Sequence, residues 1–191
     1  MGALRTPREK WVEAGLRALA EGGVDAVRVE SLAKALRVTK GGFYGYFADR
    51  EALLEEMLDT WERENVDAEI DQAERVGGDA RDKDQLVDRF LRSAARVRPV
   101  DLALRDWARR DPAVAERLRR VDNKRMRLAR ETIGSFRTDP DEVEALALLA
   151  FCLAIGSPFL AADHPGRTRD QVIARAAGII LDRPPHDPAT R

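Results

Sequence analysis

The chain has 191 residues, of which 44% are hydrophobic, 35% charged and 6% aromatic, and its formal net charge is −1. This length suits one domain, or a small domain fused to a larger one, and the composition is too apolar for a disordered chain. The single cysteine, Cys152, excludes an intramolecular disulfide, and only two histidines, His164 and His186, are available for metal or triad chemistry. No signal peptide opens the sequence, so we expect a cytoplasmic protein.

The near-neutral charge is unevenly distributed. Residues 1–50 hold nine basic and six acidic side chains, which gives +3, so the remaining residues carry −4. This balance argues against a protein that coats nucleic acid along its whole surface. The locally basic N-terminal part is nevertheless compatible with binding to DNA.

The first sixty residues predict three short helices and a long fourth one. A capping box with proline at the first helical position, Thr6–Glu9, opens the first helix. Apolar residues at positions i, i+3, i+4 and i+7 predict a second helix over Val29–Leu36. Thr39 is a good N-cap for a third short helix, Lys40–Phe47, and Asp49 caps the long fourth helix, whose outer face is rich in acids.

Five further helices are predicted downstream. Residues 86–94 and 102–108 carry apolar helical patterns, and Asp111-Pro112 provides a cap and a first helical position. Asp139–Glu142 and a capping box at Thr168–Gln171 open the last two helices. No run alternates with period two, so the sequence predicts an all-α fold of about nine helices.

The eighth predicted helix is unusually apolar. From Ala145 to Ala162 the chain has no formally charged residue for eighteen positions, the lower limit for a transmembrane helix. Gly156, Ser157 and Pro158 interrupt the stretch, and acids rather than basic anchors flank it. We therefore expect a helix buried in the protein core or in a dimer seam.

Residues 28–54 carry the most informative pattern. Two helices this short cannot bury a core alone, and their arrangement fits a helix-turn-helix, which presents its second helix to a DNA groove. Lys and Arg side chains neutralise phosphates, Tyr hydroxyls donate to phosphate oxygens, and glycines at a helix start let N–H groups approach closely. The same residues also fit solvated charges and core aromatics, so this pattern alone leaves both interpretations open.

Five segments of this stretch together resemble the signature of tetracycline-repressor-like (TetR-family) regulators. They are Leu32-Ala33, Val38–Gly41, Phe43-Tyr44, Tyr46-Phe47 and Asp49–Leu53. The resemblance covers about residues 6–55. It implies a three-helix DNA-binding domain at residues 1–50, a helical ligand-binding and dimerisation domain at 51–182, and a tail at 183–191 that we expect to be disordered. It also implies a repressor that a small molecule releases from its DNA operator.

Several positions depart from the family pattern. Arg37 stands where the family usually has a turn glycine, Gly42 replaces a small hydroxyl residue, and Gly45 replaces a larger residue. Contacts to bases are therefore harder to assign than contacts to phosphates. The residues that we expect to contact DNA are Arg28, Arg37, Thr39, Lys40, Gly41, Gly42, Tyr44, Tyr46 and Arg50.

The C-terminal part has no comparable signature, and only the resemblance implies a pocket there. The available side chains favour a largely hydrophobic small molecule with one polar or anionic end near Arg105. Each of these side chains also fits a plain packed core. The candidate pocket residues are Phe90, Leu104, Arg105, Trp107, Met126, Phe151 and Cys152.

The last two predicted helices carry more apolar surface than one small domain easily covers. Pairing across a two-fold axis would bury it in a four-helix seam, so we expect a homodimer that binds a palindromic duplex. The expected interface residues are Leu146, Leu149, Leu153, Phe159, Val172, Ile173, Ala176, Ile179 and Ile180.

A sequence-specific DNA-binding transcription regulator is thus the leading hypothesis for the function. One alternative is a helical scaffold or adaptor that does not bind DNA. A carboxylate-based hydrolase is a weaker alternative, because the sequence offers no convincing nucleophile–base pair and no metal-ligand spacing. We expect no enzymatic activity, no catalytic residue, no metal and no cofactor.

Overall fold

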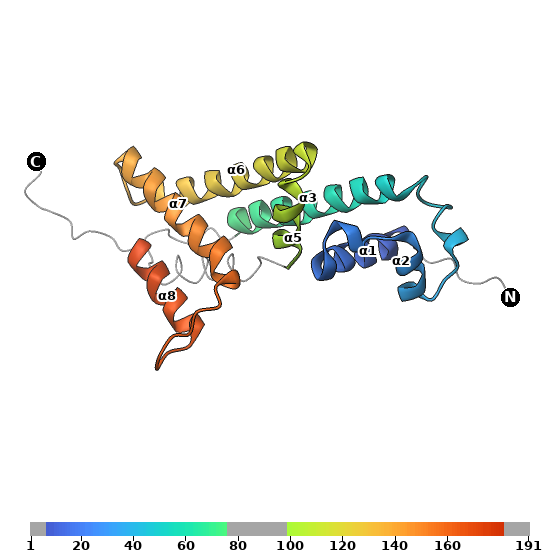
Figure 1. Cartoon of the computed structure of the whole chain (residues 1–191). Coiled ribbons are helices and arrows are strands. Elements are labelled where there is room, and N and C mark those ends of the chain that lie inside the picture. The colour runs from blue at the N-terminus through green and yellow to red at the C-terminus, as the bar shows by residue number, and fades with distance from the viewer. Residues whose placement is uncertain (1–6, 76–98, 182–191) are drawn as a thin grey trace, which may run out of the picture. The chain divides into compact units, whose positions relative to one another are not determined.

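The structure, a computed structural model, describes residues 7–75 and 99–181 (Figure 1). Within this part, the chain forms seven α-helices and three short 3-10 helices, and no strand. The described residues fall into two compact units, one comprising those up to Ala68 together with 99–122, the other comprising 69–75 and the residues from Asn123 onward. The expected all-α fold is therefore confirmed, and the expected division into domains at residue 50 stays a prediction.

The helices of the first unit follow one another with short connections. They are α1 (Arg8–Gly22), η1 (Val24–Ala26), α2 (Val29–Leu36), η2 (Lys40–Gly42), the first part of α3 (Arg50–Arg75), α5 (Pro99–Ala108) and the first turns of α6 (Pro112–Gly134). The second unit contains the rest of α6, α7 (Pro140–Gly156), η3 (Ser157–Phe159) and α8 (Arg169–Ile180).

Four predicted helix caps are confirmed, at Asp49, Asp111, Asp139 and Thr168, whereas Thr39 forms no side-chain cap hydrogen bond at η2. Asp49 Oδ1 accepts from the Ala52 N–H at 2.8 Å, and Asp111 and Asp139 cap α6 and α7 in the same way. Thr168 forms the complete capping box with Gln171 at α8. At α1, Pro7 stands just before the first helical residue, and its predicted capping partner Thr6 lies outside the described residues.

The expectation of about nine helices is slightly off, for two reasons. The helix predicted over residues 86–94 lies outside the described part of the chain. The helix predicted over Lys40–Phe47 is wrong as a continuous α-helix, because it consists of the 3-10 turn η2 followed by hydrogen-bonded turns up to Phe47. Its three glycines explain the difference, since each disfavours a helix by about 1 kcal/mol relative to alanine.

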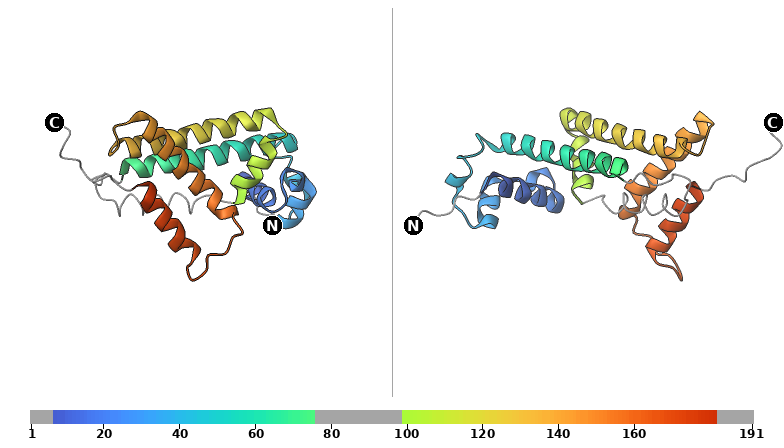
Figure 2. Two further views of the ribbon diagram at one scale, coloured as in Figure 1. Left: turned by 60° about the vertical axis from the view of Figure 1, so that its left-hand side comes forward. Right: turned by 180° about the vertical axis from the view of Figure 1, so that it is seen from behind.

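One hydrophobic core holds the first unit together. Its largest fully buried side chains are Trp11, Trp61 and Phe43, contributed by α1, α3 and the segment after η2. Gly15 lets α1 approach α3 closely, because a Cβ atom at this position would lie 2.5 Å from the Met57 Sδ. Figures 1 and 2 show α1 running alongside the first half of α3. This packing fixes the N-terminal helices on α3.

The second unit has a smaller core of its own. Ile133, Ala147 and Leu181 are buried together, and α7 and α8 lie side by side (Figure 1). Pro140–Phe159 is the one described stretch that is long and apolar enough to cross a membrane. Few of its residues are buried within this chain, and Leu148 and Leu149 are exposed. The burial that its composition predicts is therefore incomplete in a single chain.

The close approach at Gly15 makes a prediction about stability. In Gly15→Ala, overpacking against the buried Met57 costs about 1–3 kcal/mol, whereas alanine regains about 1 kcal/mol of helix propensity. We expect a net loss of about 1 kcal/mol in the free energy of unfolding, measured by urea titration. Gly134→Ala is the matched control, since a Cβ there meets nothing within 4 Å, and it should leave stability equal or slightly higher. Equal effects of the two substitutions would contradict this packing.

Candidate nucleic-acid interface

A left-handed turn joins α2 to the residues that follow it. Arg37 has φ 56° and ψ 41°, although such a conformation costs a non-glycine residue about 1–2 kcal/mol. The Arg37 N–H donates to the Lys34 carbonyl at 3.1 Å, and the Val38 N–H donates to the Ala33 carbonyl at 3.0 Å. The turn thus keeps the shape that a glycine usually provides, and it redirects the chain sharply. We refer to Arg37–Phe47 as the recognition segment.

Aromatic packing fixes the recognition segment on α1. Phe43 is fully buried, with its ring centroid 5.3 Å from that of Trp11 in an edge-to-face arrangement. Phe47 stacks on Phe43 at 5.2 Å. Between and before these buried rings, Lys40 and Tyr44 are exposed, Tyr44 by 54%, whereas Val38 and Tyr46 pack against the core. The segment therefore presents a rigid, exposed edge without being a regular helix.

Two arginines brace this arrangement from the sides. The Arg8 guanidinium lies 4.7 Å from the centroid of the Phe47 ring and pairs with Glu56 of α3 at 2.9 Å. Arg50 donates through Nε to the Val27 carbonyl and through Nη2 to the Val24 carbonyl, both at 2.7 Å. Arg8 was not among the residues singled out from the sequence, because its partners lie about forty residues further along the chain.

Lys40, the central cation of the segment, forms an ion pair with Glu30 of α2. The hydrogen bond from Lys40 lowers the pKa of the Glu30 carboxyl, and the same bond raises the pKa of the Lys40 ammonium group. Both groups are therefore charged at neutral pH, and both are exposed. Sequence reasoning missed Glu30, since only the turn at Arg37 brings it to Lys40.

The structure places the nine predicted DNA contacts on one stretch of the first unit, from Arg28 to Arg50. Gly42, Tyr46 and Arg50 are partly buried. The Arg50 guanidinium donates to main-chain carbonyls, so its main role in the structure is to stabilise the turn before α2. The Arg28 Nε donates to the Asp25 carbonyl at 3.0 Å. The exposed ones are Arg28, Arg37, Thr39, Lys40, Gly41 and Tyr44. Their contact with DNA stays a prediction.

Comparison with known proteins addresses this stretch directly. Residues 12–57 match the sequence model of the family described as bacterial regulatory proteins, tetR family. Residues 12–57 belong to the tetR family. The match spans most of α1, all of α2 and the recognition segment, and the start of α3, and it confirms the resemblance derived from the sequence.

Solved structures show that the tetR-like fold extends over most of the chain. A transcriptional regulator from Saccharomonospora viridis in complex with choline is 19% identical, with a TM-score of 0.68 over 91% of this chain and 94% of that one. A regulator from Streptomyces coelicolor A3(2) is 21% identical, with a TM-score of 0.61 over 91% and 97%. The ketosteroid transcriptional regulator of Mycobacterium tuberculosis is 19% identical, with a TM-score of 0.62 over 94% and 95%. No curated protein matches the sequence significantly.

These findings establish the fold of a tetR-family DNA-binding transcriptional regulator. Members of this family are regulators rather than enzymes, which answers the hydrolase alternative raised by the sequence.

The residues predicted to line a ligand pocket are divided between the two units of this tetR-like chain. Leu104 and Trp107 are buried in the core of the first unit. Arg105 lies between them on α5, and its two terminal nitrogens donate to the Asp122 carboxylate at 2.8 and 2.9 Å. The second unit contains Met126 and Phe151, which are half-buried, and Cys152, which is exposed, whereas Phe90 lies outside the described residues. Their role in binding stays a prediction.

The predicted dimer residues all lie on α7, η3 and α8 of the second unit. Leu149, Phe159 and Ile179 are exposed, with 55%, 38% and 63% of their surfaces accessible. Leu146 instead packs against the core of this unit. Leu153, Val172, Ile173, Ala176 and Ile180 are half-buried. The interface predicted from the sequence omitted two neighbouring leucines that are also exposed, Leu148 and Leu160, because it included only part of the apolar face.

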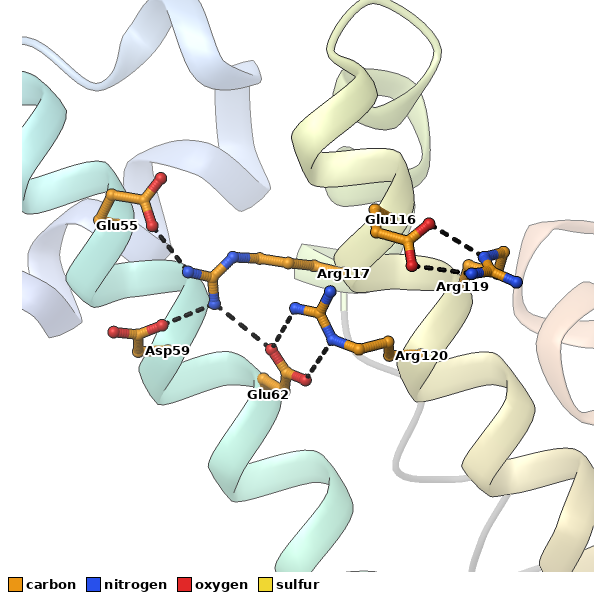
Figure 3. Close-up of polar contacts among 7 residues, drawn as sticks. All are labelled: Glu55, Asp59, Glu62, Glu116, Arg117, Arg119 and Arg120. Atoms are coloured by element: carbon orange, nitrogen blue, oxygen red, sulfur yellow. Dashed lines mark hydrogen bonds and ion pairs between the residues drawn. The ribbon is translucent and has the colours of Figure 1, made fainter.

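A charged cluster ties α3 of the tetR-family domain to α6 (Figure 3). Arg117 donates to Glu55 at 2.7 Å and to Asp59 at 2.6 Å, and it reaches Glu62 at 3.3 Å, where Arg120 also binds. Burial lowers the pKa of Arg117, but its bonds to Asp59 and Glu55 outweigh this and raise it. The acids on the outer face of α3 thus bind the half-buried Arg117 and, through Glu62, also Arg120.

The pair between Lys40 and Glu30 makes a prediction about DNA affinity. In Glu30→Gln, Lys40 loses its counter-charge and becomes free to neutralise one more phosphate. We expect severalfold tighter binding to any duplex at low salt, and a salt slope that is steeper by up to about 1, measured by fluorescence anisotropy.

Glu13→Gln is the matched control, because Glu13 forms a similar exposed pair with Lys10 on α1. It should leave affinity and slope unchanged. Identical behaviour of the two variants would show that Glu30 does not restrain Lys40.

Proposed function

We propose that this protein is a homodimeric, cytoplasmic transcription repressor that binds a palindromic DNA operator and is released by a small, largely hydrophobic molecule. The observation that carries the proposal is the exposed edge of the recognition segment. It offers Lys40 and Tyr44 to a duplex while Phe43 and Phe47 hold it on the core of a tetR-family domain.

The chemistry of this edge suits a DNA backbone and groove. The Lys40 ammonium group neutralises a phosphate or donates to a guanine, and the Tyr44 and Thr39 hydroxyls donate to phosphate oxygens. Gly41 adds no side chain, so the main-chain N–H groups at the start of η2 can approach a phosphate. The net charge of −1 favours a specific site over general coating of the duplex.

A dimer follows from the exposed apolar face of α7 and α8. Large aliphatic side chains such as Leu149 and Ile179 are mostly accessible in the single chain, and a second copy would cover them. Two-fold symmetry would then place two recognition segments on two half-sites of a palindrome, about one helical turn or slightly more apart.

Release by a ligand is supported by the fold and by the way α3 is held. A regulator of similar fold from Saccharomonospora viridis holds choline. In this chain, α3 starts directly after the recognition segment, and Arg117 binds three carboxylates along it. A ligand that favours another position of α3 would move the recognition segment, and a coupling of about 1–3 kcal/mol would change operator affinity about 5- to 150-fold.

Selection of bound sequences from a random duplex pool tests the proposal, and we expect a palindrome. Lys40→Ala and Tyr44→Phe should each weaken binding to that operator. If Lys40 contacts phosphate, its loss lowers the salt slope by about 1, and if it contacts guanine, specificity at one position relaxes by about 1–3 kcal/mol.

The matched control for these variants is Lys124→Ala, an exposed lysine on the α6 part of the second unit, which should bind like the parent protein. A protein that retains no duplex at low salt would support the adaptor alternative instead. Unchanged affinity and preference in both variants would remove the recognition segment from the interface.

Introducing a charged side chain into the proposed dimer interface tests whether that interface forms. A carboxylate in place of Leu149 or Ile179 would be buried and unpaired in the proposed seam, so we expect Leu149→Asp and Ile179→Asp to give monomers at micromolar concentration. Sedimentation equilibrium measures the mass against the 21.4 kDa of one chain. Leu102→Asp alters a leucine that is similarly exposed, but on α5 in the first unit, and it should remain dimeric. A parent protein that is monomeric at these concentrations would contradict the seam.

A further inference from the structure

One ion pair joins α2 to the start of η2 in the recognition segment. Lys40, the first residue of η2, donates to the carboxylate of Glu30, which lies in the first turn of α2. The two side chains are 48% and 68% accessible, so the pair stands at the surface. An exposed ion pair contributes little to the stability of a fold, because water and salt screen its charges. The main effect of this pair is therefore on what the surface presents to a partner.

The backbone directly after Lys40 carries no side chains, because the next two residues are glycines. A Cβ atom at Gly41 would lie 3.9 Å from the Thr39 hydroxyl oxygen, and one at Gly42 would lie 3.9 Å from the Trp11 ring. These are ordinary contact distances, and neither glycine has a positive φ, so the fold itself would accept alanine at both positions. The bare backbone leaves the space beside the ion pair open to a partner that approaches closely.

As a unit, the ion pair matches the edge of a base pair better than it matches a phosphate. An ammonium group has three donors and a carboxylate about four acceptor sites, so the bond between Lys40 and Glu30 leaves capacity on both. A phosphate would attract Lys40 but repel the Glu30 carboxylate beside it. In the major groove, a G·C pair presents two adjacent acceptors, guanine N7 and O6, next to a donor, the cytosine N4 amino group. Lys40 can donate to both acceptors while Glu30 accepts from the amino group.

An A·T pair suits the same two side chains less well. Its two acceptors, adenine N7 and thymine O4, are separated by the adenine N6 amino group, and the thymine methyl group lies beside O4. One ammonium group cannot donate to both acceptors without displacing the carboxylate from the amino group between them. The hydrogen-bonding pattern therefore favours G·C over A·T.

We propose that Lys40 and Glu30 together read one G·C base pair in each half-site of the operator, with Lys40 donating to the guanine and Glu30 accepting from the cytosine. In a helix-turn-helix, residues at the start of the second element reach base edges, and Lys40 has this place as the first residue of η2. Glu30 is then a specificity-determining residue, because it holds Lys40 away from phosphates and adds the acceptor that cytosine needs. This inference rests on the proposed function, since it requires an operator.

The operator selected from the random duplex pool provides the test. N4-methylcytosine still pairs with guanine but carries a methyl group in place of the major-groove amino hydrogen, and 7-deazaguanine lacks the N7 acceptor. Each modified base is placed at one cytosine or guanine position of both half-sites at a time, and the Kd is measured by fluorescence anisotropy. We expect one G·C position at which either modification, or exchange for A·T, weakens binding of the parent protein about fivefold or more.

Two variants assign the contacts to side chains. In Glu30→Ala, the Kd for the N4-methylcytosine operator divided by that for the unmodified operator should fall to about 1, and Lys40→Ala should lose its response to 7-deazaguanine. Because loss of Glu30 also frees Lys40 for phosphates, this ratio and not the affinity itself is the readout. Glu13→Ala, which removes a similar exposed pair on α1, is the matched control and should keep the ratio of the parent protein.

The outcomes that would overturn the inference are separate from a failure of the proposed function. A ratio unchanged in Glu30→Ala would remove Glu30 from the readout. A Lys40→Ala protein that binds all duplexes equally more weakly, with a salt slope lower by about 1, would show a phosphate contact in place of the guanine contact. Both results would be obtained with a palindrome that the parent protein binds. A parent protein that selects no palindrome would instead overturn the proposed function, and this inference with it.

Discussion

The burial of Phe43 against Trp11 is the contact on which the proposed DNA-binding edge depends. The recognition segment contains three glycines and forms no regular helix, so its own backbone gives it little rigidity. Edge-to-face and stacked aromatic pairs contribute about 0.5–1.5 kcal/mol each beyond simple burial. With Phe43 and Phe47 fixed below, Lys40 and Tyr44 are held at the surface. Tertiary packing thus replaces helix propensity as the source of order at the site.

The arginines explain how a chain of net charge −1 can offer a cationic edge. Arg8, Arg50 and Arg117 are used inside the first unit, where they bind carboxylates, main-chain carbonyls and an aromatic ring. Through these contacts the three guanidinium groups brace the fold. Lys40 is the cation left on the recognition segment's exposed edge together with Arg37, and Glu30 restrains even Lys40. Total charge is therefore a poor guide to DNA binding in this protein.

The first unit contains a cavity of about 210 Å³ where α1, α3 and the first turn of α5 meet. The family resemblance pointed to a pocket in the C-terminal part, whereas this cavity lies in the unit that contains the helices proposed to bind DNA. Helix α1 forms part of the cavity wall through Leu16 and Ala20, and it also packs on Phe43 through Trp11. The charged cluster around Arg117 holds α3 from its other side, so α3 is constrained on two faces.

The sequence by itself determined the helical class, most helix starts and the family of the N-terminal residues. These features are local: an Asp or Thr cap, an apolar residue every third or fourth position, and a contiguous motif at residues 12–57. The tertiary structure alone decided that Glu30 meets Lys40, that Arg50 is tied to main-chain carbonyls, and that Lys40–Phe47 is a packed turn. It also decided where space remains between α1, α3 and α5. Each of these depends on contacts between residues far apart in sequence or on the sharp turn at Arg37, and no local pattern encodes which distant side chain will be the neighbour.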